Sequence, residues 1–144
     1  MGPFGSFAIS ASGMEAQRIR LNTIASNLAN ANSAATPDGV SYRRKDVLFS
    51  TTPLGSTFQD VLNSRREGLS GVRIVRIIED QSPLKRVYEP SNPGADEDGY
   101  VQYPNVDVLK EMVNMMSASR SYEANITVFK ASRTMALQAL EIGS

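Results

Sequence analysis

The placement of residues that break helices constrains this chain more than any other feature. Six of its seven prolines fall in residues 33–104, together with six of its ten glycines. Residues 4–32 contain no proline, and residues 105–141 contain neither proline nor glycine. Because proline and glycine are the strongest interruptions of regular helices, the sequence predicts two long terminal helices on either side of a loop-rich middle.

The C-terminal arm carries a helical repeat. Positions in steps of four and three form a heptad seam, which runs through Val108, Met112, Met115, Ser119, Tyr122, Ile126, Phe129, Arg133, Ala136 and Leu140. Pro104 ends the preceding segment, and Asn105 or Asp107 can cap the first helical turn. Gly143 stands where a helix stop belongs. We therefore expect one helix of about 37 residues, roughly 55 Å long.

The N-terminal arm repeats the same steps. Its seam runs through Phe7, Ala11, Met14, Arg18, Leu21, Ala25 and Leu28. Ile24 widens the apolar stripe. We expect the helix to fade through residues 26–32, because Asn and Ser side chains compete with the backbone for hydrogen bonds. A turn at residues 36–39 is expected to follow.

The middle of the chain is expected to hold a few short strands. Residues 72–78 are the best candidate, because they are dense in β-branched side chains and follow a glycine. Weaker candidates are residues 47–49, 86–88 and 100–103. Residues 51–70 give no clear pattern, although residues 58–62 suit one helical turn.

We interpret the fold as mainly α, with two long terminal helices pairing as an antiparallel coiled-coil hairpin around a loop-rich insert with a few short β-strands. The three parts are residues 1–32, 33–104 and 105–144. Packing within one molecule is one account of both seams. It leaves the backs of the helices in water, including Ile24, Leu109 and Met116. We therefore favour arms that become ordered against other copies or other proteins.

Composition restricts the available chemistry. The chain has no Cys and no His, which removes thiolate nucleophiles, disulfides and the commonest general base and metal ligand. Its 15 basic and 15 acidic residues cancel, which argues against a nucleic-acid binder. No stretch approaches the about 20 apolar residues of a membrane span, and residues 1–5 do not resemble a cleaved secretory signal. We expect a protein that is not an enzyme, without cofactor, metal, nucleic-acid partner or membrane insertion.

Three charged segments resemble functional sites, and none of them has the full pattern of one. Residues 96–99 resemble part of a calcium loop, but the register puts Asn105 where a bidentate glutamate belongs. The basic run at residues 43–45 is interpreted as a solvated loop. Glu79 and Asp80 are adjacent, so on a strand they point to opposite faces and cannot converge on one substrate atom.

Several segments resemble the axial proteins of the bacterial flagellum. Residues 12–18 (SGMEAQR) and 24–32 (IASNLANAN) are similar to the N-terminal signature of that family. In the family this signature is followed by a threonine, a glycine and a tyrosine and then by basic residues. In this chain the same residue types occur with longer spacing, over residues 36–45. The resemblance continues through residues 87–90, 92–93, 95–96, 99–101, 103–108, 111–113 and 118–125.

The resemblance implies a structural subunit of the proximal rod, which polymerises through its terminal helices into the hollow drive shaft that transmits torque. It implies contacts with other copies of the chain, other rod proteins, membrane-ring proteins and rod-adaptor proteins. It also implies export by the flagellar type III apparatus, without a cleavable signal, to a basal body in the periplasmic space. Two alternatives are another rod or hook protein of the same family and a non-flagellar coiled-coil adaptor. A cell-wall-cleaving enzyme is disfavoured because no acid–base pair is credible.

The resemblance assigns the two seams to assembly. The predicted assembly interface consists of Phe7, Met14, Leu21, Ile24, Asn27, Leu28, Asn30, Met112, Met115, Tyr122, Asn125, Ile126, Phe129 and Leu140. For Asn27, Asn30 and Asn125 two roles are open. They either form hydrogen bonds between subunits that fix the register, or they are exposed asparagines near helix ends.

A first prediction concerns order in the monomer. If the arms need partners, dilute protein should show only partial helicity, because burial within one hairpin does not offset the entropy of ordering both arms. Far-ultraviolet circular dichroism of a chain shown to be monomeric measures this. Full helicity in a strict monomer would contradict the prediction.

Overall fold

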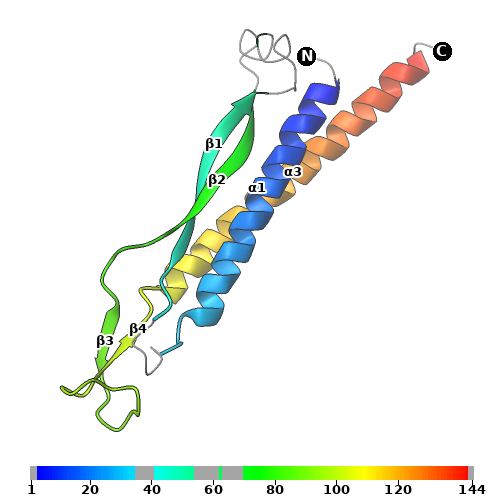
Figure 1. Cartoon of the computed structure of the whole chain (residues 1–144). Helices are drawn as coiled ribbons and strands as arrows, with labels where there is room; N and C mark the ends of the chain where they lie inside the picture. Colours follow the sequence, from blue (N-terminus) through cyan, green and yellow to red (C-terminus); the bar gives the residue numbers. More distant parts are fainter. Residues whose placement is uncertain (1–2, 35–40, 54–61, 63–69, 143–144) are drawn as a thin grey trace.

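Two long helices dominate the architecture. The computed structural model describes residues 3–34, 41–53, 62 and 70–142. Helix α1 spans Pro3–Asn30 and helix α3 spans Val108–Ile142. They lie side by side and antiparallel, so that the first turn of α1 and the last turn of α3 are at the same end (Figure 1). The predicted mainly α hairpin with a strand-containing insert is confirmed.

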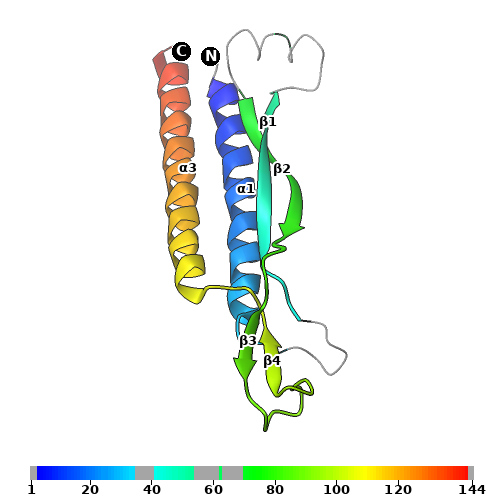
Figure 2. The ribbon, with the colours of Figure 1, turned by 90° about the vertical axis from the view of Figure 1, so that its left-hand side faces the viewer.

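The insert forms two antiparallel ribbons. Strand β1 (Lys45–Pro53) pairs with β2 (Ser70–Glu79), and β3 (Lys85–Tyr88) pairs with β4 (Tyr100–Tyr103). Each of the four predicted strand segments lies within one of these strands, although β1 and β2 extend beyond the predicted residues. Figure 2 shows α1 between α3 and the β1–β2 ribbon, with β3 and β4 beyond the other end of the helices.

The β1–β2 ribbon contains a β-bulge. Leu48 pairs with Arg76 and Phe49 pairs with Ile74, so Val75 has no partner on β1. An extra residue of this kind bends the strand and changes which side chains share a face.

The helices approach each other through small and polar side chains. On α3 the buried residues are Glu111, Ala118 and Ser132, and seven-residue spacing places them on one line of the helix surface. On α1 the buried positions are Ser10, Gly13, Ala16, Thr23, Ile24 and Asn27. The buried positions of α1 serve its contacts with both α3 and the β1–β2 ribbon. Where the two helices meet, small residues such as Gly13 and Ala118 allow their backbones to lie close together.

The residues of the predicted seams flank the line of small buried residues at which the two helices are closest. Phe7, Met14, Leu21 and Leu28 are half-buried, whereas the intervening seam positions Ala11, Arg18 and Ala25 are exposed. On α3, Met115, Tyr122, Ile126 and Phe129 are half-buried, whereas Met112 and Leu140 are 51% and 71% exposed. Large apolar residues set the sequence pattern, but the small residues set the closest approach.

Two contacts fix the register of the helix pair. The rings of Phe7 and Phe129 lie 5.0 Å apart, centroid to centroid, as the antiparallel arrangement predicts. Further along, Gly13 lies against the side chain of Asn125. This register leaves the end of α3, which includes Ile142, beyond the start of α1.

The helix ends agree partly with the predictions. Helix α1 ends at Asn30, inside the segment where fading was expected. Helix α3 is capped by Asp107, whose Oδ1 accepts hydrogen bonds from the backbone N–H groups of Leu109 (3.0 Å) and Lys110 (3.2 Å). The alternative cap, Asn105, binds the chain before β1 instead. The predicted turn at residues 36–39, most of the helical turn at 58–62 and the stop at 143 lie outside the described residues.

Gly13 gives a second prediction. A Cβ at this position would lie 2.8 Å from Asn125 Oδ1, so Gly13→Val should force the helices apart and lower the unfolding free energy by about 1–3 kcal/mol. Urea denaturation followed by circular dichroism, at a concentration where the wild-type chain is helical, measures the loss.

The matched control is Ala11→Val, at an exposed position of the same helix, which should cost less than about 1 kcal/mol. Adding Asn125→Ala to Gly13→Val should recover part of the loss, because it removes the side chain that the valine meets. Equal losses for the two valine variants would refute the conclusion that Gly13 lies at a close contact between the helices.

Candidate functional site: a buried polar junction and an exposed apolar patch

Three segments meet at a buried polar cluster, which we call the buried junction. It comprises Asn27 on α1, Tyr42 and Arg44 before β1, Lys45 at the start of β1 and Glu111 in the first turns of α3. Asn27 is fully buried and Glu111 is 1% exposed. Buried polar groups of this kind are tolerated only when their hydrogen bonds are made within the protein.

The Asn27 amide uses its full bonding capacity. Its Oδ1 accepts hydrogen bonds from the backbone N–H of Lys45 and the hydroxyl of Tyr42, both at 2.9 Å. Its Nδ2 donates to the backbone carbonyl of Lys45 at 2.8 Å and to Glu111 Oε2 at 2.9 Å. The side chain therefore binds both backbone groups of Lys45, as a neighbouring strand would, and attaches the start of β1 to α1.

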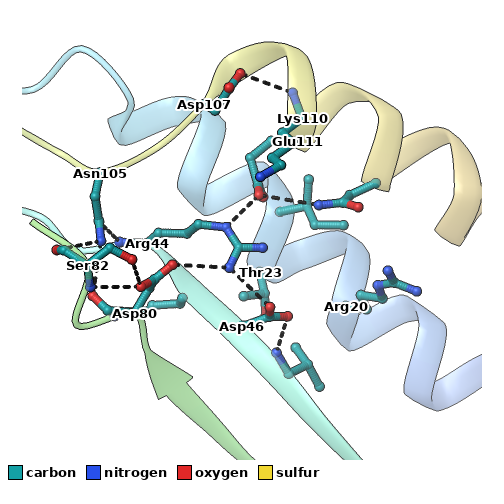
Figure 3. Close-up of a pocket in the computed structure, with 14 residues that line it drawn as sticks. Arg20, Thr23, Arg44, Asp46, Asp80, Ser82, Asn105, Asp107, Lys110 and Glu111 are labelled. Carbon is teal, nitrogen blue, oxygen red and sulfur yellow. Dashed lines mark hydrogen bonds and ion pairs between the residues drawn. The ribbon is translucent and has the colours of Figure 1, made fainter. Parts of the chain in front are cut away.

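The Glu111 carboxylate joins α3 to the same point. Its Oε1 accepts a hydrogen bond of 2.8 Å from Arg44 Nε, and Oε2 accepts the bond from Asn27. Arg44 Nη1 also lies 3.0 Å from Asp46 Oδ2 and 3.8 Å from Asp80 Oδ2. Partial burial by itself would lower the pKa of Arg44, but the hydrogen bonds to Glu111 and Asp46 outweigh it and raise that pKa. Figure 3 shows the guanidinium between these carboxylates.

A second set of bonds holds the entry to α3. Asn105 Oδ1 accepts a hydrogen bond from the backbone N–H of Arg44 at 2.8 Å, and its Nδ2 donates to the carbonyl of Asp80 at 3.0 Å. The Asp80 carboxylate accepts hydrogen bonds from the hydroxyl and the backbone N–H of Ser82. These bonds, aided by the charge of Arg44, lower the pKa of Asp80. The segment after β2 is thus tied to the segment before α3.

These contacts correct one prediction. The basic run at residues 43–45 is not a solvated loop, since the Arg44 side chain is 20% exposed and Lys45 begins β1. Arg43 Nη1 also donates to the carbonyls of Asp80 and Ser82. The prediction was wrong because the partner of Arg44, Glu111, is 67 residues away in sequence.

A cavity of about 440 Å³ opens beside the buried junction. Its lining carries both charge signs, since Arg20 and Lys110 are basic and Asp46, Asp80 and Asp107 are acidic (Figure 3). Within the described ranges, no group of three or more His, Cys, Asp or Glu side chains could hold a metal ion. The cluster around the cavity is arranged to join segments of the chain.

A second feature lies on the outward face of α3. Leu109, Met112, Val113 and Met116 are 76%, 51%, 60% and 57% exposed. Their spacing places them on one face, opposite the line that contains Glu111. We call these four residues the outward patch.

Past the outward patch, the same face of α3 becomes polar and small. Arg120, Thr127 and Ala131 continue it, and all three are exposed. The outward patch is therefore separated along α3 from the large exposed apolar residues later in the helix, which are Val128, Met135, Leu137, Leu140 and Ile142.

The predicted interface residues divide by exposure. Ile24 and Asn27 are buried, Met112 and Leu140 are exposed, and the half-buried group is Phe7, Met14, Leu21, Leu28, Asn30, Met115, Tyr122, Asn125, Ile126 and Phe129. Asn27 is not the exposed asparagine of the second alternative, because it is buried. Its four hydrogen bonds lie within the chain, and a bond to another subunit stays a prediction.

Asn30 and Asn125 differ from Asn27. Each donates from Nδ2 to the carbonyl one helical turn before it, at Ser26 (2.8 Å) and Ser121 (2.9 Å). A bond from either residue to another subunit stays a prediction.

Sequence reasoning missed Glu111 and Arg44. The available signal was the spacing of Glu111, Ala118, Asn125 and Ser132, which recur every seven residues beside the apolar seam. One carboxylate on a line of small residues indicates a buried, paired acid at a helix contact. Arg44 had no such signal, because it lies in a short segment between α1 and β1.

Neither helix in the described part of the chain combines the length and apolar character that a membrane span requires.

Comparison with protein families places the chain in a class. Residues 7–34 match the family described as flagella basal body rod protein. Residues 97–142 match the family described as flagellar basal body rod FlgEFG protein C-terminal. The two matches fall on α1 and on the segment from β4 through α3, the parts that form the helix pair and carry Asn27 and Glu111. The class is therefore that of the flagellar basal-body rod proteins.

Individual relatives narrow the class to one member. The chain is 50% identical to the flagellar basal-body rod protein FlgC of Salmonella typhimurium, over 95% of both chains. It is 44% identical to FlgC of Bacillus subtilis over 99% of both chains, and 42% identical to FlgC of Borreliella burgdorferi over 99% of this chain and 98% of that one. The chain belongs to the FlgC family of flagellar basal-body rod proteins. It is a structural protein of the bacterial flagellar rod.

The buried junction gives a third prediction. Glu111→Ala leaves the Arg44 guanidinium and one Asn27 N–H without their buried partner, so the unfolding free energy should fall by about 3–5 kcal/mol. Urea denaturation at a helical protein concentration measures the change.

Glu123→Ala is the matched control, because Glu123 is exposed on the same helix, and it should change the free energy by about 0.5 kcal/mol or less. Similar small losses at both positions would show that Glu111 is not the essential partner of Arg44.

Proposed function

We propose that the chain polymerises through its two helices into the hollow axial rod of the flagellum, where it transmits torque. Membership of the FlgC family supports the place of the chain in the rod. The outward patch is the single observation that carries the proposed mode of assembly. Four large apolar side chains that face water on one side of a helix cost free energy unless another molecule covers them.

In this proposal the two faces of α3 make different contacts. The face that contains Glu111 and Ala118 packs on α1 within the chain, so it is not available to a neighbour. The outward patch is available, and Met112 belongs both to it and to the predicted interface. A subunit with one internal face and one external face can join the next copy by a heterologous contact, which builds an open helical assembly.

The end of α3 supplies a second apolar surface. Leu137, Leu140 and Ile142 are 51%, 71% and 88% exposed, and the helix register leaves this end beyond the start of α1. We infer that a neighbouring helix covers it, as we propose for Leu140 in the predicted interface. The half-buried residues Leu21 and Ile126 then serve both the helix pair and its neighbours.

The proposed partners are other copies of the chain, other rod proteins, membrane-ring proteins, rod-adaptor proteins and the flagellar type III export apparatus. The proposed location is the rod within the periplasmic space. A role in assembly requires no catalytic group, and the buried carboxylate of Glu111 is occupied by Arg44 and Asn27. We therefore propose a purely structural role.

The fourth prediction tests the outward patch. Met112→Asp together with Met116→Asp should abolish swimming and remove the chain from purified hook–basal bodies, because two buried carboxylates without partners would oppose the contact. Soft-agar motility and immunoblots of isolated hook–basal bodies measure the two effects in a strain whose only copy is the variant.

Thr127→Asp is the control on the same face of α3, outside the patch, and should leave both readouts unchanged. The cellular level of each variant is measured in parallel, so that degradation is separated from failed assembly. Normal swimming of the double variant, at normal protein level, would refute the proposed contact.

A further inference from the structure

The β1–β2 ribbon is held on the helix pair by directional polar contacts near both of its ends. At one end the hydroxyl of Ser12 accepts a hydrogen bond of 3.1 Å from the backbone N–H of Val72. At the other end the buried junction binds Lys45 through Asn27. Apolar contact alone is non-directional and lets two surfaces slide, whereas hydrogen bonds require a defined geometry.

The buried junction is an unusual way to hold two elements together. Moving the Glu111 carboxylate and the Arg44 guanidinium out of water costs much of the energy that their attraction returns, so a buried ion pair adds little net stability. Breaking such a pair is nevertheless costly, because the remaining charge is left buried. Its best-supported use is to specify one arrangement over others.

We propose that Asn27, Arg44 and Glu111 are positioning residues that set one fixed angle between the β1–β2 ribbon and the helix pair. Each belongs to a different segment, and the three bond directly to one another through Glu111 at 2.8 and 2.9 Å. These bonds hold the start of β1 against both helices, and together with the Ser12–Val72 bond near the other end of the ribbon they oppose a change of the angle.

The proposal also concerns assembly, and in that respect it rests on the proposed function. Every subunit of a helical assembly repeats the same contacts, so an error in the relative placement of two surfaces is repeated along the filament. The buried junction keeps the ribbon in a constant relation to the outward patch on α3. If the ribbon could move on the helix pair, the outward patch would keep its position on α3, but the position of the ribbon would differ from one subunit to the next.

The test replaces the polar pair by apolar side chains, in Arg44→Met with Glu111→Leu, and measures geometry directly. The natural chain has no cysteine, so paired spin labels can be attached without background. One pair, at Arg76→Cys and Lys130→Cys, reports the ribbon against α3. A second pair, at Ala11→Cys and Lys130→Cys, reports the helix pair alone. All three positions are exposed.

The experiment measures the distribution of distances between the two spin labels, by electron–electron double resonance on the purified full-length chain. In the double variant the ribbon-to-helix distribution should broaden about twofold, while the helix-to-helix distribution stays unchanged. Glu111→Gln keeps the shape of the side chain and should give a smaller broadening. Arg86→Met, which removes the exposed ion pair with Asp96 on the other ribbon, should change neither distribution.

Three outcomes would overturn the proposal. Unchanged distributions in both Glu111 variants would show that other contacts set the angle. Equal broadening of both label pairs would show that the cluster serves stability and not position. A wild-type chain without a single ribbon-to-helix distance would contradict a fixed angle directly. All variants are compared at a concentration where circular dichroism shows the wild-type chain to be helical. The readout is a distance within the chain, so a failure of this proposal is distinguishable from a failure of the outward patch in the motility test.

Discussion

The arrangement of this chain depends on one carboxylate. Glu111 reaches from the start of α3 into a buried site, where Arg44 and Asn27 bind its two oxygens. Through these bonds, α3 is joined to α1 and to the segment that begins the β1–β2 ribbon. The stability of the fold and the relative placement of its segments therefore both depend on Glu111.

The helix pair has small and polar side chains along the centre of its contact, and half-buried apolar residues such as Phe7 and Phe129 flank them. Along α3 the contact with α1 runs through Glu111, Ala118 and Ser132, whereas Leu109 and Met116 face outwards. Small residues let the backbones approach, and they leave the large apolar side chains for contacts outside the subunit. This distribution suits the proposed assembly, because the exposed apolar side chains are available for contacts between molecules.

The sequence was sufficient for the local structure and insufficient for the buried junction. Heptad spacing and the exclusion of proline predicted both helices, and β-branched density predicted the core of β2, because these signals act between near neighbours in the chain. The bond from Asn27 to Glu111 spans 84 residues, and the bond from Arg44 to Glu111 spans 67. No periodicity records such a pair. The sequence indicated hydrogen bonding as one of two roles for Asn27, but only the fold shows that its partners belong to the same chain.

The bulge at Val75 decides where two positive charges lie. Arg73 pairs with Ser50 and Arg76 with Leu48, positions two apart on β1, so both arginines share one face of the ribbon although they are three apart on β2. In an uninterrupted strand they would point to opposite sides. Both are exposed, as is Leu48. One unpaired residue therefore gives the ribbon a cationic side, and the electrostatic character of that surface follows from strand register as much as from composition.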